Sequence, residues 1–214
     1  MPQATSSVIH RPFEDADFDA VVDICVRIWC TGVEGVYDRM IFGRVMTAGA
    51  LRRSQIATVA TKDGVVVGAC FGGLSQGGSS TTNEVWSVRF DELMTIARKR
   101  AKIGGIEVEE TLFSRLRMYT TADVFISFGY TNAESEVNLL VVDPRHMHEG
   151  IGTRLFEDMV LALCSEDAHG CFVVLREDYD LEFFEHRGLS CIQRKGGASG
   201  DTGDRVIYLY GRRL

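Results

Sequence analysis

The segment of residues 139–155 restricts the possible folds of this chain more than any other segment. Four consecutive apolar residues at 139–142 indicate the end of a buried strand. Pro144 stops that strand, because proline cannot donate a main-chain hydrogen bond to a sheet. A polar loop follows, and Gly150-Ile151-Gly152 opens a helix whose apolar residues recur at steps of three and four. This order predicts an α/β fold in which a strand enters a helix through glycines.

The glycine turn is also a candidate anion site. The first amides of a helix have no partners within the helix, and the helix dipole adds positive potential there. Glycine lets a phosphate approach the backbone, and Arg145, Thr153 or Arg154 could add contacts. Alternatively, the same glycines only shape a tight turn, which a bare GxG pattern favours. A dinucleotide-binding turn is excluded, because Leu155 stands where its third glycine would be.

Composition excludes several classes of function. A length of 214 residues suits one domain, and the net charge of −7 argues against nucleic-acid and membrane-surface partners. The chain has no apolar run near the ~20 residues of a membrane span and no secretory signal, so we expect a cytoplasmic protein. The cysteines and histidines lack metal-ligand spacing, so we expect no metal.

Periodicity and turn residues predict the order of elements along the chain. The pair Asp63-Gly64 indicates a hairpin turn, because both residues tolerate positive φ. We read residues 73–82 as a Gly/Ser/Thr loop. Strands are expected at 8–13, 56–61, 65–72, 136–142, 171–175, 191–193 and 206–210, with a possible further strand at 124–130. Helices are expected at 15–29, 36–53, 83–102, 108–119, 151–165 and 181–187.

Three motifs in this order resemble one family. The run VVDPRHMHEGIGTRLF resembles the acetyl-CoA segment of the GNAT (GCN5-related N-acetyltransferase) superfamily, in which a V-x-P strand end leads into [QR]-x-x-G-x-[GA]. Ile9-His10-Arg11-Pro12 followed by Asp17 resembles its opening strand and helix. The stretch FFEHRGL at 183–189 resembles its late F-Y-E-K-x-G-F element. The resemblance covers residues 8–75 and 134–212.

This resemblance implies a fold and an activity. The fold would be a GNAT α/β fold, with a mixed, mostly antiparallel sheet of about seven strands flanked by helices, in one domain of residues 1–214. The activity would be that of an enzyme, an N-acetyltransferase that carries an acetyl group from acetyl-CoA to a primary amine by direct attack. In this family the strand at 136–142 splays from the strand at 171–175 and leaves room for the cofactor. The implied cofactor-binding residues are Leu140, Val141, Val142, Met147, His148, Glu149, Gly150, Ile151, Gly152 and Thr153.

Three positions depart from the family pattern. Met147 replaces the usual Gln or Arg, which removes a side chain but leaves the main-chain amides. His148 replaces a Gly and must adopt a backbone conformation that favours glycine. Phe184 replaces the Tyr that protonates the departing thiolate in many members. Either another group, of which Tyr179 is nearest in sequence, supplies that proton, or the thiolate leaves without a dedicated acid.

A general base is expected on the strand at 136–142, because an ammonium acceptor must lose a proton before it attacks. Alternation along the strand places Glu134, Glu136, Asn138, Leu140 and Val142 on one face. Glu136 stands where family members often carry a base that acts through water, and Glu134 is the second choice. An exposed glutamate at a strand start, with no catalytic role, is an equal alternative.

The sequence does not specify the acceptor partner beyond a small-molecule or peptide amine. Residues 76–133 lie outside the resemblance and are read as a helical insertion that covers the acceptor site or builds a homodimer contact. Two alternatives to transfer stay open. One is a catalytically weak or inactive acyl-CoA-binding sensor or scaffold, and the other is a protein that uses the fold without a cofactor.

Overall fold

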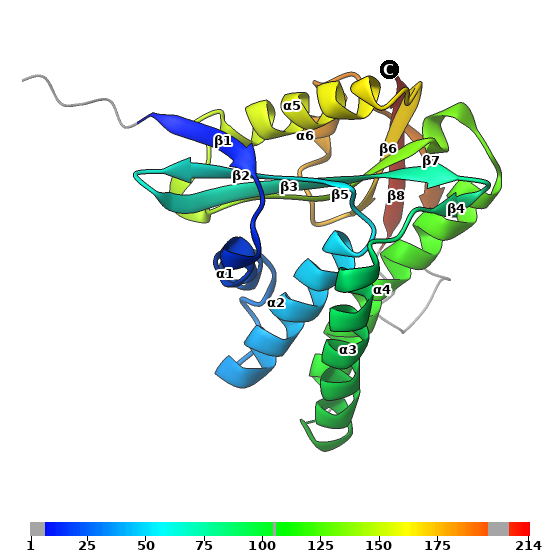
Figure 1. Cartoon of the computed structure of the whole chain (residues 1–214). Coiled ribbons are helices and arrows are strands. Elements are labelled where there is room, and N and C mark those ends of the chain that lie inside the picture. The colour runs from blue at the N-terminus through cyan, green and yellow to red at the C-terminus, as the bar shows by residue number, and fades with distance from the viewer. Residues whose placement is uncertain (1–6, 105, 197–205) are drawn as a thin grey trace, which may run out of the picture.

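The computed structural model describes residues 7–104, 106–196 and 206–214, and it is built around one mixed sheet (Figure 1). The sheet has eight strands in the order β1-β2-β3-β5-β6-β8-β7, and β4 pairs with β3 off this path. Neighbouring strands are antiparallel except β5 and β6, which are parallel. The strands are β1 (Val8–Pro12), β2 (Ile56–Lys62), β3 (Val65–Gln76), β4 (Ser79–Ser80), β5 (Ser135–Val142), β6 (Gly170–Arg176), β7 (Ser190–Lys195) and β8 (Ile207–Arg213).

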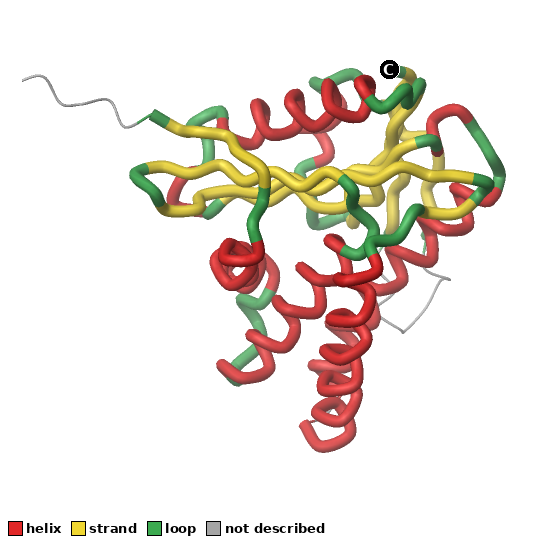
Figure 2. Tube along the Cα trace, in the orientation of Figure 1, coloured by secondary structure: helices red, strands yellow, loops and turns green. Residues whose placement is uncertain are grey.

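Helices cover both faces of this sheet. In Figure 1, α5 and α6 lie on one face, and α1 to α4 lie on the other. Figure 2 shows the same layers, with red helices on either side of the yellow strands. The α-helices are α1 (Phe18–Trp29), α2 (Val36–Leu51), α3 (Glu84–Gly104), α4 (Ile106–Ser127), α5 (Ile151–Ser165) and α6 (Leu181–Glu185). Three short 3-10 helices, η1 (Asp15–Asp17), η2 (Thr131–Ala133) and η3 (Pro144–His146), lead into α1, β5 and the loop before α5.

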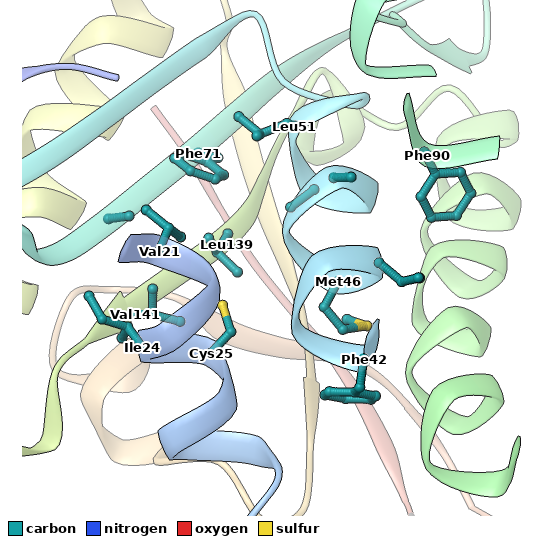
Figure 3. Close-up of a cluster of buried hydrophobic side chains, with 14 of the residues drawn as sticks. Val21, Ile24, Cys25, Phe42, Met46, Leu51, Phe71, Phe90, Leu139 and Val141 are labelled. Atoms are coloured by element: carbon teal, nitrogen blue, oxygen red, sulfur yellow. The ribbon is translucent and has the colours of Figure 1, made fainter. Parts of the chain in front are cut away.

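The larger core lies between the sheet and α1, α2 and α3. Figure 3 shows Val21 and Ile24 of α1, Met46 of α2, and Leu139 and Val141 of β5 gathered between these elements. All of these side chains are buried, in agreement with the three- and four-residue spacing of apolar positions in α1 and α2. The face of β5 that carries Leu139 and Val141 is therefore closed by helices.

Two further cores cover the rest of the sheet. Leu155 and Met159 of α5 pack against the opposite face of β3, β5 and β6. On the face that α1, α2 and α3 cover, Phe125 and Ile126 of α4 pack against Phe172 of β6 and against β8. The helices α2 and α4 therefore cover the same face on either side of the boundary between β5 and β6.

Residues 124–130, read as a possible strand, are not a strand. The helix α4 runs through Ser127, and a turn follows it. Ala122, Phe125 and Ile126 are buried together at helical spacing, so the helix period buries them and not a strand period of two. The β-branched and aromatic composition of this stretch was misleading, because tertiary packing overrides strand propensity.

The loop expected at residues 73–82 is also shorter than predicted. The strand β3 continues to Gln76, and Ser79 and Ser80 fold back to pair with it. Gly77 and Gly78 make this turn with φ values of 57° and 77°, which glycine adopts at no steric cost. This hairpin supplies the eighth strand, where about seven were expected.

No helix within the described residues is both long and apolar enough to cross a lipid bilayer. The longest of them, α3 and α4, carry charged residues throughout their length.

Candidate functional site

The two parallel strands at the middle of the sheet separate soon after they meet. Their paired residues are Ser135 with Cys171 and Glu136 with Phe172. At this end the Ser135 hydroxyl donates a hydrogen bond to the carbonyl of Gly170 at 2.8 Å, which holds the strands together. Beyond Glu136 the strands diverge, so the sheet is open between the two strands over the rest of β5.

A cavity of about 650 Å³ occupies this opening, a size typical of small-molecule sites. Its lining comes from both helical layers, so the cavity reaches both faces of the sheet. On one face it is lined by α5 and α6, and on the other by α1, α2 and α4. The principal lining segments are residues 137–142 of β5, 146–148 and 150–153 of the loop and α5, 173–175 of β6, and 178–180 of the loop that follows β6.

Main-chain N–H groups of β5 point into the cavity. The amide of Asp143 donates to the carbonyl of Val67 in β3 at 2.8 Å. Amides of a strand alternate in direction, so the amide of Val141 also points toward β3. The amides of Leu140 and Val142 therefore point the other way, toward β6 and the cavity.

The loop after β5 is held by the buried carboxylate of Asp143, which is 1% exposed. It accepts hydrogen bonds from the Arg145 amide at 3.0 Å and from the Arg145 guanidinium at 2.7 Å. Arg27 of α1 donates to the same carboxylate at 2.7 Å. These donors, Arg145 foremost, lower the pKa of Asp143 to about 2 against the opposing effect of burial. The carboxylate is thus a fixed anchor between α1 and the loop.

The turn into α5 has the backbone conformation expected of an anion cradle. Gly150 caps the helix at φ 80°, and His148 adopts φ 64° although it has a side chain. A Cβ on Gly152 would lie 3.3 Å from Val142 and 3.7 Å from Phe183, so glycine keeps this approach open. In the described part of the chain, the amides of Ile151, Gly152 and Thr153 donate to no main-chain oxygen, as expected for a first helical turn.

Arg187 lies beside this turn and was not singled out from the sequence. Its guanidinium donates to the Thr153 hydroxyl and to the carbonyl of Phe183, and it stacks 3.5 Å above the Phe183 ring. Its Nε is buried without a hydrogen-bond partner. A guanidinium beside a helix N-terminus adds positive charge that favours an anion there. The sequence signal that could have pointed to Arg187 was its position in the FFEHRGL motif at 183–189.

Almost all the residues expected to hold the cofactor line this cavity: Leu140, Val141, Val142, Met147, His148, Gly150, Ile151, Gly152 and Thr153. Glu149 is the exception. Its carboxylate accepts a hydrogen bond from Lys62 at 2.8 Å and lies 3.1 Å from His146 Nδ1. The Glu149 side chain therefore lies on the outer side of the loop and does not line the cavity.

The expectation that Glu136, Asn138, Leu140 and Val142 share one face is wrong. A bulge shifts the pairing of β5 with β3 between Phe71 and Gly72, and it reverses the alternation at Asn138. Leu140 and Val142 pack toward α5, whereas Glu136 and Asn138 hydrogen-bond to Arg53 at the end of α2. The bulge thus places Glu136 on the sheet face opposite Leu140 and Val142.

The carboxylate of Glu136 is buried, and its residue is not part of the cavity lining. Arg53 donates to it at 2.7 Å and to Asp123 of α4 at 2.6 Å. Burial raises the pKa of Glu136, and the Arg53 charge opposes that rise. Glu134, the second candidate, lies at the surface, where it accepts a hydrogen bond from the His169 amide at 2.8 Å.

Tyr179 lines the cavity, and its ring stacks on that of Trp29 with centroids 6.5 Å apart. Phe184 also lines the cavity, but it is 8% exposed and packs edge-on against Phe156 and Phe183. The structure therefore brings Tyr179 to the same cavity as the expected cofactor residues.

The sequence also did not predict the part of the cavity wall on the sheet face that α1, α2 and α4 cover. It is formed by Ile28 and Trp29 of α1, Met46 of α2, and Met118 and Tyr119 of α4. Ile28, Trp29 and Met46 lie in two of the predicted helices, where apolar residues equally suit a core position. Met118 and Tyr119 lie in the segment that resembled no family motif, so no signal in the sequence pointed to them.

Comparison with solved structures identifies the fold. A mosquito arylalkylamine N-acetyltransferase-like 5b protein matches with a TM-score of 0.56 and 16% identity, over 97% of this chain and 100% of the other. A Drosophila melanogaster polyamine N-acetyltransferase matches with a TM-score of 0.57 and 16% identity, over the same shares of the two chains. A GCN5-related N-acetyltransferase from Kribbella flavida matches with a TM-score of 0.56 and 14% identity, over 97% of this chain and 98% of the other.

The sequence matches no family model and no curated protein. At these identities the structural likeness shows the fold, which is the GNAT fold that the three sequence motifs predicted. The matches extend over nearly the whole chain, so they do not mark residues 76–133 as an insertion.

Proposed function

We propose that this chain is an N-acyltransferase that carries an acetyl group from acetyl-CoA to a primary amine. The observation that carries the proposal is the opening between β5 and β6. It joins free main-chain amides of β5 to the glycine turn at the start of α5 in one cavity. A long ligand with a phosphate group at one end and an amide-containing arm fits this combination. The N-acetyltransferases with the same fold support the choice of reaction.

The residues present fit acetyl-CoA at both ends of such a ligand. The amides of Ile151, Gly152 and Thr153, with the guanidinium of Arg187, would hold its diphosphate by charge-assisted hydrogen bonds. The amides of Leu140 and Val142 would bind the pantetheine arm along β5. Acetyl-CoA supplies an acyl group that is activated as a thioester.

The amide of Leu140 would act directly on the reaction. It is aimed into the cavity, whose wall here is formed by Val141, Val142 and residues 173–175 of β6. A fixed N–H group in such a place stabilises negative charge that develops on a carbonyl oxygen. The direction of the strand amides favours Leu140 over Val141 for this role.

An acceptor ammonium must lose a proton before its nitrogen forms the C–N bond. Glu136 remains the proposed base, acting through water, since its carboxylate does not itself line the cavity. Its ion pair with Arg53 constrains this role, because a proton taken up by Glu136 weakens that pair. Burial raises the pKa of Glu136, so a base at this position loses activity as the pH falls through a value above that of an ordinary carboxylate.

The C–S bond breaks as the C–N bond forms, and the sulfur leaves as a thiolate that needs a proton. Phe184 has no proton to give. Tyr179 is the proposed donor, because its residue lines the cavity and the stack on Trp29 fixes the plane of its ring. Proton donation by a positioned side chain contributes about 10²–10⁴-fold to rates.

Two observations favour a second candidate, an acyl-CoA-binding module without turnover. The usual acid position holds Phe184, and the carboxylate of Glu136 is engaged by Arg53. Neither observation affects the amides of the cradle, so the module would bind acetyl-CoA as tightly as an enzyme does.

A thiol-release assay with pooled primary amines separates the two candidates. We expect acetyl-CoA to raise the melting temperature, because it binds the native state, and amines to accelerate thiol release above the hydrolysis background. A thermal shift without amine-dependent release would establish the binding module. The absence of any shift with millimolar CoA would contradict both candidates.

A further inference from the structure

The far end of the cavity is apolar and aromatic. Its wall consists of Ile28, Trp29, Met46, Met118 and Tyr119, contributed by α1, α2 and α4. Figure 1 shows these three helices on the face of the sheet opposite α5 and α6. This end is therefore separated by the sheet from the glycine turn, and it is where an acceptor would reach a donor lying between β5 and β6.

The acidic residues that line the cavity in the described part of the chain are Asp178 and Asp180, and both are engaged. Arg176 donates to the two oxygens of Asp178 at 3.0 and 2.6 Å. Asp180 accepts from the Phe183 amide at 3.0 Å as the cap of α6. An acceptor with a second positive charge would bury that charge without a free carboxylate, which disfavours its binding.

The α4 part of this wall is held rigidly. The Tyr119 ring packs so closely on Gly49 of α2 that a Cβ there would lie 3.0 Å from its hydroxyl. Arg53 lies above the Tyr119 ring and joins Asp123 of α4 to Glu136 of β5. Burial raises the pKa of the Tyr119 phenol, so the wall stays uncharged at that residue. The far end is thus a preformed pocket, which costs little ordering entropy on binding.

We propose that the acceptor is a primary amine with an apolar, flat body, and that Met118 of α4 is a specificity-determining residue in contact with that body. The proposal rests on the proposed function. Flat rings suit this pocket, because Trp29 and Tyr119 offer ring surfaces and Met46 and Met118 offer adaptable thioethers.

The test compares 2-phenylethylamine with putrescine, which carries a second ammonium in place of the ring. With acetyl-CoA as donor, we expect kcat/KM for 2-phenylethylamine to exceed that for putrescine by about 10-fold or more. Calorimetry with CoA-saturated protein gives a second readout that needs no turnover, and 2-phenylethylamine should bind more tightly there too. A preference for putrescine in both measurements would overturn the proposal and leave the proposed function standing.

Charged variants of Met118 test the residue. Met118→Lys should lower kcat/KM and affinity for 2-phenylethylamine about 10-fold, whereas Met118→Glu should shift the preference toward putrescine. Val124→Lys and Val124→Glu are the matched controls, because Val124 lies on the same helix at 53% exposure and outside the cavity lining. Equal effects at both positions would overturn the assignment of Met118.

The remaining outcomes are also decisive. Hexanoyl-CoA is a second donor to compare. If Met118→Lys slows transfer from hexanoyl-CoA but leaves the ratio of kcat/KM for the two amines unchanged, the apolar end holds the acyl chain and the proposal is wrong. If 2-phenylethylamine binds but no amine is acetylated, the proposed function fails while the proposed pocket is supported. Folding of each variant is checked by the melting temperature with and without CoA.

Discussion

The guanidinium of Arg53 donates to the Glu136 carboxylate at 2.7 Å, and both residues are buried, at 3% and 5% exposure. This pair joins the end of α2 to the start of β5, next to the point where β5 and β6 separate. Arg53 also binds Asp123 of α4. One buried arginine, in the turn after α2, therefore connects β5 to α4, which forms part of the proposed acceptor pocket.

Removal of Arg53 should destabilise the chain strongly. Arg53→Met leaves the Glu136 carboxylate buried without its partner, and we expect a loss of about 3–5 kcal/mol of unfolding free energy at pH 8. The loss should shrink as the pH falls, because protonation removes the unpaired charge. Urea unfolding measures both effects. The double variant Arg53→Met/Glu136→Leu should be more stable than Arg53→Met, and equal stability would contradict the importance of the pair.

Asp143 should contribute to stability in a defined pH window. Its pKa is about 2 in the folded chain, mainly because of Arg145, against roughly 3.9 when unfolded. The carboxylate therefore stabilises the fold above the unfolded pKa, and this contribution is lost as the pH falls through about 2. Since Arg145 is 70% exposed, screening limits the contribution to about 2 kcal/mol.

Unfolding of Asp143→Asn and the parent chain between pH 7 and pH 2 tests this window. The difference in unfolding free energy should decline below about pH 4. Asp23→Asn is the control, because Asp23 lies 4.0 Å from the same Arg27 but is exposed, and its loss should stay under about 0.5 kcal/mol. A pH-independent difference for Asp143→Asn would exclude an electrostatic origin.

The cradle at the start of α5 is tested by a charge at Gly150. Gly150→Asp places a carboxylate where the amides would bind phosphate, so the thermal shift induced by CoA should disappear. Gly64→Asp is a matched control, because Gly64 has a similar φ of 77° and open space around its Cα. Both variants should lose about 1 kcal/mol of stability from the left-handed backbone. A shift retained in Gly150→Asp would exclude the cradle.

Arg187 should recognise phosphate. Arg187→Met should weaken CoA binding by about 10-fold or more, the effect of one charge-assisted hydrogen bond. Binding of pantetheine, which lacks the diphosphate, should not change. Calorimetry compares the two ligands, with Arg194→Met as control, since Arg194 also lies over a ring, that of Tyr208, but outside the cavity. Equal losses for both ligands would indicate a packing role for Arg187.

Tyr179 should act in proton transfer and not in cofactor binding. Tyr179→Phe keeps the ring that stacks on Trp29 and removes the hydroxyl. We expect kcat to fall about 100-fold with little change in the KM for acetyl-CoA. Steady-state kinetics measure both values, and Tyr208→Phe, outside the cavity, serves as the control. An unchanged kcat would show that the thiolate leaves without this acid.

The strand, glycine turn and helix of residues 139–155 were predictable because each makes a local demand on the backbone. Pro144 must end a strand, and Gly150 at φ 80° needs a residue without a side chain. His148, at a position that usually holds glycine, adopts the expected positive φ although it has a side chain. These backbone constraints depend only on consecutive residues, so they can be recognised without a structure.

The position of Glu136 could not be predicted, since a bulge opposite Phe71 and Gly72 reverses the alternation on which its face was assigned. The prediction of a strand at 124–130 was wrong because Phe125 and Ile126 pack against Phe172, a residue far along the chain, and this packing favours a helix. Arg53, Met118 and Arg187 likewise meet the site from separate elements. The local sequence thus specified the glycine turn and, through three ordered motifs, the fold. Contacts between distant residues set the lining of the cavity, because close packing across the sheet leaves no periodic pattern in the chain.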